Sequence, residues 1–313
     1  ALLSLGDYQR GWAEYEWRMQ RPSVPILLAD PGCSQWDGIS SLSAKTLLVM
    51  GEQGLGDILQ SWRYVHSLER DALRCIACLP QCLHRLIRSA GFSGELIGPD
   101  ELPSAVWDEW VALGSLPQLH AASPSNPGAV NGYLQVGCDP LAERVVDLSP
   151  ADQPLVGICW QGNPAAERFV LRGRSIPLHA FAPLVAAAPV RLLSLQKLVG
   201  LDQFDECAFR SSFVDWQDEF TPVLDFADVA IMMQRCDLII TVDTSVAHLA
   251  GAMGLPTWLL LHQVPDWRWG LDGDTTFWYP SMRLFRQREA GDWDEVMQRV
   301  AVAFQDFVST RSG

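Results

Sequence analysis

The run DLIITVDTSVAHLAGAMGLP joins a strand end to a helix start, with polar side chains between them. Its first six residues predict a buried strand, and the alanine- and glycine-rich residues that follow predict a helix with Ser245 as N-cap. Such a helix start binds a diphosphate through free N–H groups and the positive end of the helix dipole. Asp243, Thr244 and His248 would line this anion site, where His248 donates a hydrogen bond to phosphate. In the alternative, Asp243 and Ser245 only cap the helix and His248 is a satisfied core histidine.

The run GEQGLGDILQS combines a glycine-rich turn with a carboxylate at a second predicted helix start. Gly54 and Gly56 permit a tight turn after the strand TLLVM, and Asp57 follows them. A carboxylate within hydrogen-bond reach of a hydroxyl can remove its proton as the oxygen attacks. Asp57 is therefore a candidate general base, with Glu52 and Gln53 as neighbouring back-ups. The alternative is that Asp57 is only an N-cap.

A third polar segment, WQGNPAAERFVLRGRSIPL, follows the predicted strand PLVGICW. Gln161 and Asn163 could donate or accept hydrogen bonds, and Arg174 could act as a fixed cation. Such a cation stabilises the charge that builds on a departing diphosphate, and it does so without a metal. Arg168 and Arg172 are either further phosphate ligands or solvated loop charges.

Two shorter stretches, SLQK and DFADVA, place polar side chains at a strand end and a helix start. Their chemistry suits hydrogen bonds to a ribose and a base, and the residues concerned are Gln196, Lys197, Asp225 and Asp228. For Asp225 the alternative is a helix cap.

Aromatic residues crowd the run PDWRWGLDGDTTFWYPSMRLFRQ. Flat rings can stack on a sugar, with an arginine nearby for phosphate, and Trp267 and Arg268 are the candidates for the acceptor side. Tryptophan more often packs in a core or an interface. A packing role is therefore the first alternative for each of Trp267, Trp269 and Trp278, and Tyr279 and Arg286 lie in the same run.

These polar segments follow strands in two series of alternating strands and helices. The first series begins at TLLVM and the second at PLVGICW, which predicts an α/β protein with two doubly wound, Rossmann-like domains facing a cleft. Open parallel sheets bind ligands at the carboxyl ends of their strands. The expected divisions are a partial helical repeat at 1–22, a linker at 23–45, an acceptor domain at 46–150, a donor domain at 151–290 and a C-terminal helix at 291–313.

The first residues, ALLSLGDYQRGWAEYEWRMQRP, predict a helical turn, a tight corner and an amphipathic helix. This segment resembles the last half of a tetratricopeptide repeat, a unit that needs neighbours to bury its apolar face. We therefore expect further repeats upstream. The alternative is a lone amphipathic helix that caps the next domain.

Composition excludes several classes of protein. A formal charge of -14, without a stripe of basic and aromatic residues, argues against nucleic acid as a partner. No apolar run reaches the ~18 residues of a membrane span, and eight dispersed cysteines suit a reduced compartment. The expected location is cytoplasmic, with a peripheral position on the inner face of the membrane left open. Cys75, Cys78 and Cys82 are spaced C-x2-C-x3-C, but strand alternation separates the first two, so buried thiols are favoured over a metal site.

The run at 237–256 resembles the donor-binding motif of the heptosyltransferases, family 9 of the glycosyltransferases. In that motif an Asp, a Gly two residues on and a His five residues on meet the donor, and Asp243, Ser245 and His248 occupy these positions here. Serine in place of glycine leaves less room for the phosphates. The resemblance also implies that Asp57 is the general base. Arg174 and Pro177 match the basic residue and proline of the family only loosely.

The aromatic run at 265–287 resembles the C-terminal signature of bacterial proteins in which tetratricopeptide repeats precede a heptosyltransferase-like domain. The implied fold is GT-B, and the implied reaction is metal-independent, inverting transfer of a sugar from a nucleotide diphosphate to a glycan, lipid-linked or protein acceptor. No cofactor is expected, and upstream repeats would recruit a protein partner. Two alternatives remain: a sugar-nucleotide-binding scaffold without turnover, and a nucleotide-sugar epimerase on the same fold.

Overall fold

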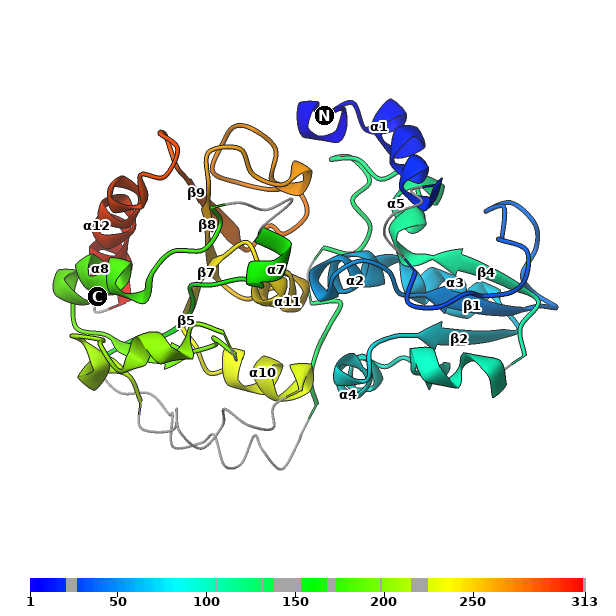
Figure 1. Cartoon of the computed structure of the whole chain (residues 1–313), viewed down its shortest axis with the longest axis horizontal. Coiled ribbons are helices and arrows are strands. Elements are labelled where there is room, and N and C mark those ends of the chain that lie inside the picture. Colours follow the sequence, from blue (N-terminus) through cyan, green and yellow to red (C-terminus); the bar gives the residue numbers. More distant parts are fainter. Residues whose placement is uncertain are drawn as a thin grey trace.

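A computed structural model describes residues 1–20, 27–104, 106–130, 132–137, 153–167, 173–197, 199–214 and 225–311. Two parallel sheets, each with its own helices, lie side by side (Figure 1). We call the unit built on the first sheet the N-lobe and the unit built on the second the C-lobe. The expected boundary between residues 150 and 151 lies outside the described residues, as do Arg168, Arg172 and the first part of the expected linker.

The N-lobe sheet has the strand order β3-β2-β1-β4, with every pair parallel. Both central strands are buried over nearly their full length, as expected for strands covered on both faces. The strands are β1 (Thr46–Met50), β2 (Arg74–Cys78), β3 (Glu95–Ile97) and β4 (Glu109–Ala112). The helices are α2 (Leu55–Ser61), α3 (Val65–Asp71), α4 (His84–Ser89) and α5 (Leu116–Leu119).

The C-lobe sheet has the order β6-β5-β7-β8-β9, again with parallel pairs only. Its strands are β5 (Leu155–Cys159), β6 (Arg191–Ser194), β7 (Leu238–Val242), β8 (Thr257–Leu261) and β9 (Met282–Arg286). Its helices are α7 (Pro164–Glu167), α8 (Ala182–Ala187), α10 (Phe226–Met233), α11 (Ser245–Met253) and α12 (Trp293–Arg311). The long α12 packs on α8 and β9, so the C-terminal helix belongs to the C-lobe.

Short 3-10 helices connect or extend these elements. They span Leu3–Leu5, Glu16–Gln20, Trp62–Tyr64, Gln81–Leu83, Pro99–Ser104, Leu113–Ser115, Leu178–Phe181, Leu201–Phe204, Arg210–Ser212 and Trp267–Trp269. One of them divides the first predicted helix of the N-lobe into α2 and α3. Two strands were not expected from the sequence, because β4 lies in an irregular region and β9 lies within the aromatic run.

The strand order reverses once in each sheet, between β1 and β4 and between β5 and β7. The loops at the carboxyl ends of such neighbours diverge and leave room for a ligand. The loop after β1 contains the turn that precedes Asp57, and the loop after β7 contains Asp243. Both candidate motifs therefore lie where open parallel sheets bind ligands.

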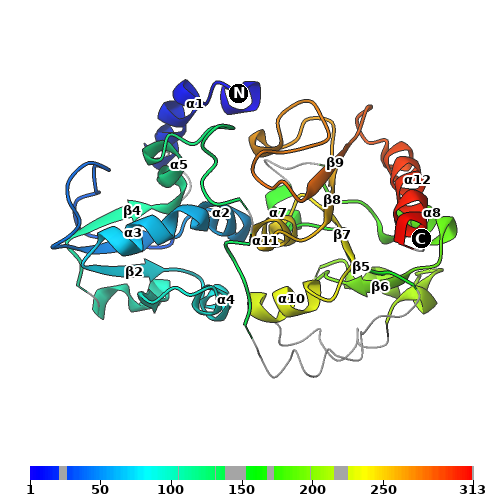
Figure 2. The same cartoon turned by 180° about the vertical axis from the view of Figure 1, so that it is seen from behind.

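The two lobes meet through helices. Helix α2 of the N-lobe packs on α11 of the C-lobe, and α4 packs on α10, as both views show (Figures 1 and 2). One apolar cluster continues across this contact, because it includes Leu47 and Val111 of the N-lobe together with Ile239 and Leu259 of the C-lobe. The GT-B-like arrangement of two facing lobes is thus present.

The N-terminal segment, residues 1–20, is packed on the body of the protein. Helix α1 (Tyr8–Tyr15) begins at Asp7, whose carboxylate accepts the N–H of Arg10 at 3.2 Å. Trp12 is 3% exposed, and its indole N–H donates to the Ala122 carbonyl at 2.7 Å. The segment therefore covers part of the body, and its relation to a tetratricopeptide array stays a prediction.

The cysteine triplet does not form a cluster. Cys75 and Cys78 lie on opposite faces of β2 and belong to two different hydrophobic clusters. Within the described ranges, no three His, Cys, Asp or Glu side chains are grouped closely enough to hold a metal ion. None of the helices described is both long and apolar enough to cross a bilayer.

Candidate functional site

The start of α2 uses Asp57 as part of its cap. Gly54 is the N-cap, and Asp57 is the third helical residue, whose Oδ2 accepts the Gly54 N–H at 2.9 Å. Asp57 is therefore not the N-cap residue itself. Its other oxygen, Oδ1, forms an ion pair with Arg268 of the C-lobe. Both carboxylate oxygens are thus held by donors, one from each lobe.

Arg268 connects three side chains at the junction of the lobes. Besides Asp57 it donates to Gln60 of α2, and its Nη1 lies 2.8 Å from Oδ1 of Asp266. Burial alone would lower its pKa, but the carboxylates of Asp266 and Asp57 raise it well above the usual value. Arg268 is a buried, permanent cation next to the candidate base.

A small pocket opens beside Asp57 and Arg268. Trp12 and Tyr15 of α1 form one wall, and Trp267 lies opposite, 5.2 Å from Trp12 between ring centres in an edge-to-face contact. The pocket holds about 10 Å³, room for about one water molecule. An acceptor would therefore need these side chains to move.

Glu52 and Gln53 bind protein groups beside the pocket. Glu52 is 1% exposed, and its two oxygens accept from Arg18 at 2.7 Å and 2.9 Å, while the Gly114 N–H also donates to it. Gln53 adopts φ 58°, a conformation that non-glycine residues rarely take, and it donates to the Tyr15 hydroxyl at 2.9 Å. The loop after β1 is thus tied to the N-terminal segment.

Helix α11 begins one residue earlier than the sequence suggested. The N-cap is Thr244 and Ser245 is the first helical residue, so the prediction of Ser245 as N-cap is wrong. The Thr244 side chain does not cap; its hydroxyl instead lies 3.4 Å from that of Thr241. The N–H groups of Ala247 and His248 donate to the Thr244 carbonyl, so among the described residues those of Ser245 and Val246 remain available to an anion at this helix start.

Asp243 is 5% exposed and lies directly before this helix start. Burial, followed by the negative charge of Asp266, raises its pKa to about 7, although Arg174 and Arg268 act in the opposite direction. A carboxyl group with this pKa is partly protonated near neutral pH. It could therefore approach a phosphate oxygen with less repulsion than an ordinary carboxylate.

His248 brings the two motifs into contact. Its ring packs on Gly56, where a Cβ would come within 2.6 Å of the imidazole Cδ2. The Nδ1 atom lies 2.9 Å from the Tyr279 hydroxyl, and Trp269 stacks on the ring at 5.3 Å between centres. Burial, and then the charges of nearby arginines led by Arg268, lower the pKa of His248 well below 6.5. The imidazole is therefore neutral, and its Nδ1 atom has a partner among the described residues.

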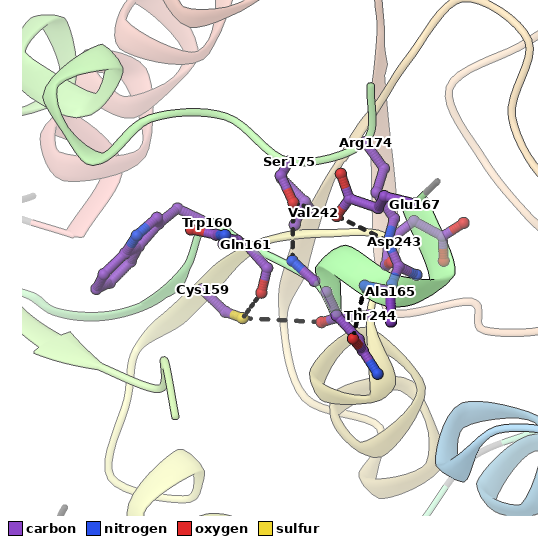
Figure 3. Close-up of polar contacts among 12 residues, drawn as sticks. Cys159, Trp160, Gln161, Ala165, Glu167, Arg174, Ser175, Val242, Asp243 and Thr244 are labelled. Atoms are coloured by element: carbon purple, nitrogen blue, oxygen red, sulfur yellow. Dashed lines mark hydrogen bonds and ion pairs between the residues drawn. The ribbon is translucent and has the colours of Figure 1, made fainter. Parts of the chain in front are cut away.

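The loop after β5 reaches the same place (Figure 3). Arg174 is 8% exposed, donates to the Asp243 carbonyl at 2.8 Å and lies 3.4 Å from a carboxylate oxygen of Glu167. Asn163 is exposed, and its Oδ1 accepts the Ala165 N–H at 2.9 Å at the start of α7. Gln161 accepts from Gln203 at 3.0 Å. Arg174 is thus the only one of the three candidates that contacts the Asp243 segment among the hydrogen bonds of the described residues.

Gln196 and Lys197 follow β6. The Gln196 amide accepts the N–H groups of Trp160 and Gln161 and donates to the carbonyls of Gln161 and Val199, at 2.8–3.1 Å. The three bonds with Trp160 and Gln161 hold the loop after β5, and the bond to Val199 lies within the loop after β6. Lys197 is exposed.

Asp225 and Asp228 form the cap of α10. Asp225 is its N-cap and accepts from Ala227 and Asp228, and the Asp228 carboxylate accepts the Asp225 N–H at 3.2 Å. Arg85 of α4 forms ion pairs with both carboxylates across the lobe contact. The capping role named as the alternative for Asp225 is present, and a role in binding ribose or base remains a prediction.

The aromatic run divides into packing and pocket residues. Trp269, Trp278 and Tyr279 are at most 2% exposed, whereas Trp267 is half-buried and lines the pocket. Arg286 donates to loop carbonyls, including that of Gly273 at 2.7 Å. Sequence reasoning missed several residues of the site. Trp12, Tyr15 and Gln60 reach it from distant segments, whereas Asp266 and Glu167 pair with arginines of their own loops.

Comparisons with known proteins agree with this architecture. Residues 208–269, which include the Asp243 motif, match the model of Glycosyltransferase family 9 (heptosyltransferase). Protein FlbA of Caulobacter vibrioides is 28% identical over 340 residues, covering 99% of this chain and 54% of FlbA. The chain therefore spans about half the length of this curated relative.

Three solved structures share the fold. ADP-heptose lps heptosyltransferase II of E. coli matches with a TM-score of 0.57 and 12% identity, over 86% of this chain and 100% of that one. A family 9 glycosyl transferase from Veillonella parvula gives 0.55 and 11%, over 90% and 100%. The iron-containing dodecameric glycosyltransferase TibC of enterotoxigenic E. coli gives 0.55 and 13%, over 87% and 77%.

At these identities the structural likeness concerns the fold alone, and the family match concerns the segment at the start of α11. The segment that leads into α11 is thus similar to the family 9 glycosyltransferases, and the chain has the GT-B fold of the solved heptosyltransferases.

Proposed function

We propose that the chain is a metal-independent, inverting glycosyltransferase that moves a sugar from a nucleotide diphosphate to an acceptor hydroxyl. The observation that carries the proposal is the contact of Gly56 with His248, because it brings the loop after β1 and the start of α11 to one place. Each of these segments lies at a reversal of strand order. A donor on α11 and an acceptor beside Asp57 would be neighbours there.

The chemistry assigns a role to each charged group. Asp57 takes the proton of the acceptor hydroxyl while its oxygen bonds to the anomeric carbon of the sugar. The bond from that carbon to the phosphate oxygen breaks, and the nucleoside diphosphate leaves. Arg174 and the free N–H groups of α11 stabilise the charge on the leaving group, which is why no metal is required.

In this scheme Arg268 forms an ion pair with Asp57 until a donor binds. Its guanidinium is shared between Asp57, Asp266 and Gln60. A diphosphate near α11 would compete for this cation and free one oxygen of Asp57 for the acceptor. Donor binding would then precede activation of the base.

The test is turnover with a panel of nucleotide sugars and with glycan, lipid-linked and protein acceptors. We expect Asp57→Asn to lower transfer at least about 100-fold, since a positioned general base contributes that much or more. The matched control is Asp292→Asn, which alters a carboxylate that caps α12, far from the lobe contact (Figure 1). Equal turnover by both variants would remove Asp57 from the mechanism.

A second candidate is a protein that binds sugar nucleotides without turning them over. It is favoured by the engagement of both Asp57 oxygens and by the small volume of the pocket. Calorimetry that detects nucleotide binding, together with no transfer or hydrolysis across the panel, would support this candidate over the first.

In this proposal the N-terminal segment forms the acceptor side of the site. We assign it to the end of a tetratricopeptide array that recruits the acceptor, in a cytoplasmic setting. Trp12 and Tyr15 would then connect acceptor recruitment with the pocket beside Asp57. If Trp12→Ala lowers the efficiency of transfer to an acceptor and leaves donor binding unchanged, the role of this segment in acceptor binding is supported.

A further inference from the structure

Tyr279 is buried in the C-lobe and contacts α11, the helix that contains His248. Its ring covers Gly251 of α11, where a Cβ would come 2.4 Å from the tyrosine ring. Its hydroxyl lies 2.9 Å from Nδ1 of His248, one turn earlier on that helix. The tyrosine is 0% exposed, so water does not compete for this hydrogen bond.

A buried cation lies against the Tyr279 ring. Arg63 is 4% exposed, and its guanidinium carbon is 4.9 Å from the centre of that ring. It donates to the carbonyls of Gln60 and Trp278 and to the Tyr133 hydroxyl at 3.3 Å. Among the described residues no carboxylate pairs with it.

The charge of Arg63 orients the tyrosine hydroxyl. A cation attracts the lone pairs of a nearby hydroxyl oxygen and repels its hydrogen, so the hydrogen points away from Arg63 and toward Nδ1 of His248. The Tyr133 hydroxyl is a second neighbour of the Tyr279 hydroxyl, and it accepts from Arg63 at 3.3 Å and donates its own hydrogen to the Leu59 carbonyl at 3.1 Å. The removal of Tyr133 therefore tests whether Tyr279 donates to His248 independently of this neighbour.

A neutral imidazole has one donor and one acceptor nitrogen. If Nδ1 accepts from Tyr279, the hydrogen of His248 resides on Nε2. Nε2 would lie 3.4 Å from a Cβ built on Gly56, at the junction of the lobes, and it has no hydrogen-bond partner among the described residues.

We propose that Tyr279 is a positioning residue that fixes the tautomer of His248, so that the Nε2–H group is a neutral hydrogen-bond donor for a phosphate oxygen of a nucleoside diphosphate. The role in ligand binding rests on the proposed function, whereas the tautomer does not. A donor without charge fits this place, because a protonated histidine would face the three cations of Arg268, Arg63 and Arg174.

The first test is nuclear magnetic resonance of the chain labelled with ¹⁵N-histidine. Long-range ¹H–¹⁵N correlations distinguish the two tautomers, and His248→Gln identifies the His248 signals among six histidines. We expect hydrogen on Nε2 in the wild-type chain at pH 7 and a mixture of tautomers in Tyr279→Phe. Tyr133→Phe is the matched control, because it removes a buried hydroxyl of the same cluster and should leave the tautomer unchanged.

The second test is calorimetric titration of wild type and both variants with ADP, GDP, UDP, CDP and dTDP. We expect Tyr279→Phe to weaken the tightest of these about fivefold, the effect of one neutral hydrogen bond, and Tyr133→Phe to leave it unchanged. Hydrogen on Nδ1 in the wild type, or an intact Nε2–H tautomer in Tyr279→Phe, would overturn the proposal. If no diphosphate binds the wild type while the tautomer is as expected, the proposed function fails and the positioning role of Tyr279 stands.

Discussion

Gly56 is the residue at which a single added carbon would disturb the contact between the lobes. It is the second residue of α2, where alanine favours the helix by about 1 kcal/mol over glycine. The His248 ring nevertheless occupies the position of the missing Cβ, with Cδ2 only 2.6 Å away. Steric exclusion therefore acts against helix propensity at this position.

We expect Gly56→Ala to be destabilising by about 1 to 3 kcal/mol, the usual cost of overfilling a packed contact. Urea unfolding gives the free energy of unfolding. The control is Gly137→Ala, because a Cβ at Gly137 meets no atom within 4 Å. A stabilising effect at position 56 would mean that the His248 ring moves aside at little cost.

We expect the contribution of Asp243 to the free energy of unfolding to fall as pH rises, whereas that of most carboxyl groups rises. Its pKa is about 7 in the folded chain, through burial and the charge of Asp266, against an ordinary value of 3.8. Between about pH 4 and 7 the unfolded chain has released this proton and the folded chain has not. The contribution of Asp243 to stability therefore falls as pH rises through this window and is level above it.

We expect Asp243→Asn to gain stability relative to wild type as pH increases from 5 to 8. Urea midpoints at each pH unit measure the difference between the two proteins. Curves that remain parallel over this range would show that the Asp243 carboxyl is ionised throughout.

At the residue scale the sequence predicted which residues are near the site better than it predicted their partners. The strand-and-turn signals located Asp57, Asp243 and His248, because each follows a buried apolar run. Their contacts with Arg268 and Tyr279 depend on how loops far apart in the chain approach each other, and no local pattern reports this. The cap of α11 was misplaced by one residue since Thr244 and Ser245 are both good N-cap residues.

The N-terminal segment shows how one buried ion pair attaches an element. Arg18 and Glu52 are 7% and 1% exposed and lie 2.7 Å apart, and Arg18 also donates to Ser115 at 2.9 Å. Removing one partner of such a pair leaves an uncompensated buried charge, which typically costs about 3 to 5 kcal/mol. Detachment of the segment would limit this cost by exposing Glu52 to water.

We expect Arg18→Met to destabilise the chain by several times more than Arg10→Met, which removes an exposed pair with Asp7 worth about 0 to 1 kcal/mol. The double variant Arg18→Met, Glu52→Gln should recover part of the loss. Urea unfolding with tryptophan fluorescence measures all three proteins. Equal effects of the two single variants would show that the buried pair does not hold the segment.

At the element scale the strands made of continuous apolar runs were predictable, and the two strands without such a run were not. TLLVM coincides with β1, and DLIITV contains β7, because each is a continuous apolar run with a turn after it. The strand β4 has four residues, and β9 carries arginines at both its second and last positions, so neither shows the pattern of a buried strand. The split of α2 from α3 at Trp62–Tyr64 follows from packing, which the sequence does not display.

At the scale of the whole molecule the two lobes share one apolar cluster. A shared core couples their unfolding, because neither lobe can lose its packing without exposing part of the other's surface. The ion pairs of Arg85 with α10 add little to this coupling, since the Arg85 side chain is 44% exposed.

We therefore expect a single thermal transition by calorimetry, with the same midpoint by far-ultraviolet circular dichroism. A nucleotide that binds at the lobe contact should move the whole transition upward. Two resolved transitions would contradict the coupling. The presence of two parallel sheets was foreseeable from the order of strands and helices. The extent of the contact between the lobes was not, because residues of α2, α4, α10 and α11 make it. A sequence pattern predicts that these residues are buried but not which helix they pack against.

The register of the C-lobe sheet has a consequence for how the chain reaches its native state. Strand β5 pairs with β7, so that Val156 lies beside Leu238. The central pair of the sheet must await a closure over some eighty residues, which is entropically costly and slow compared with hairpin formation. During that interval apolar strands remain uncovered, and refolding yield should fall as protein concentration rises.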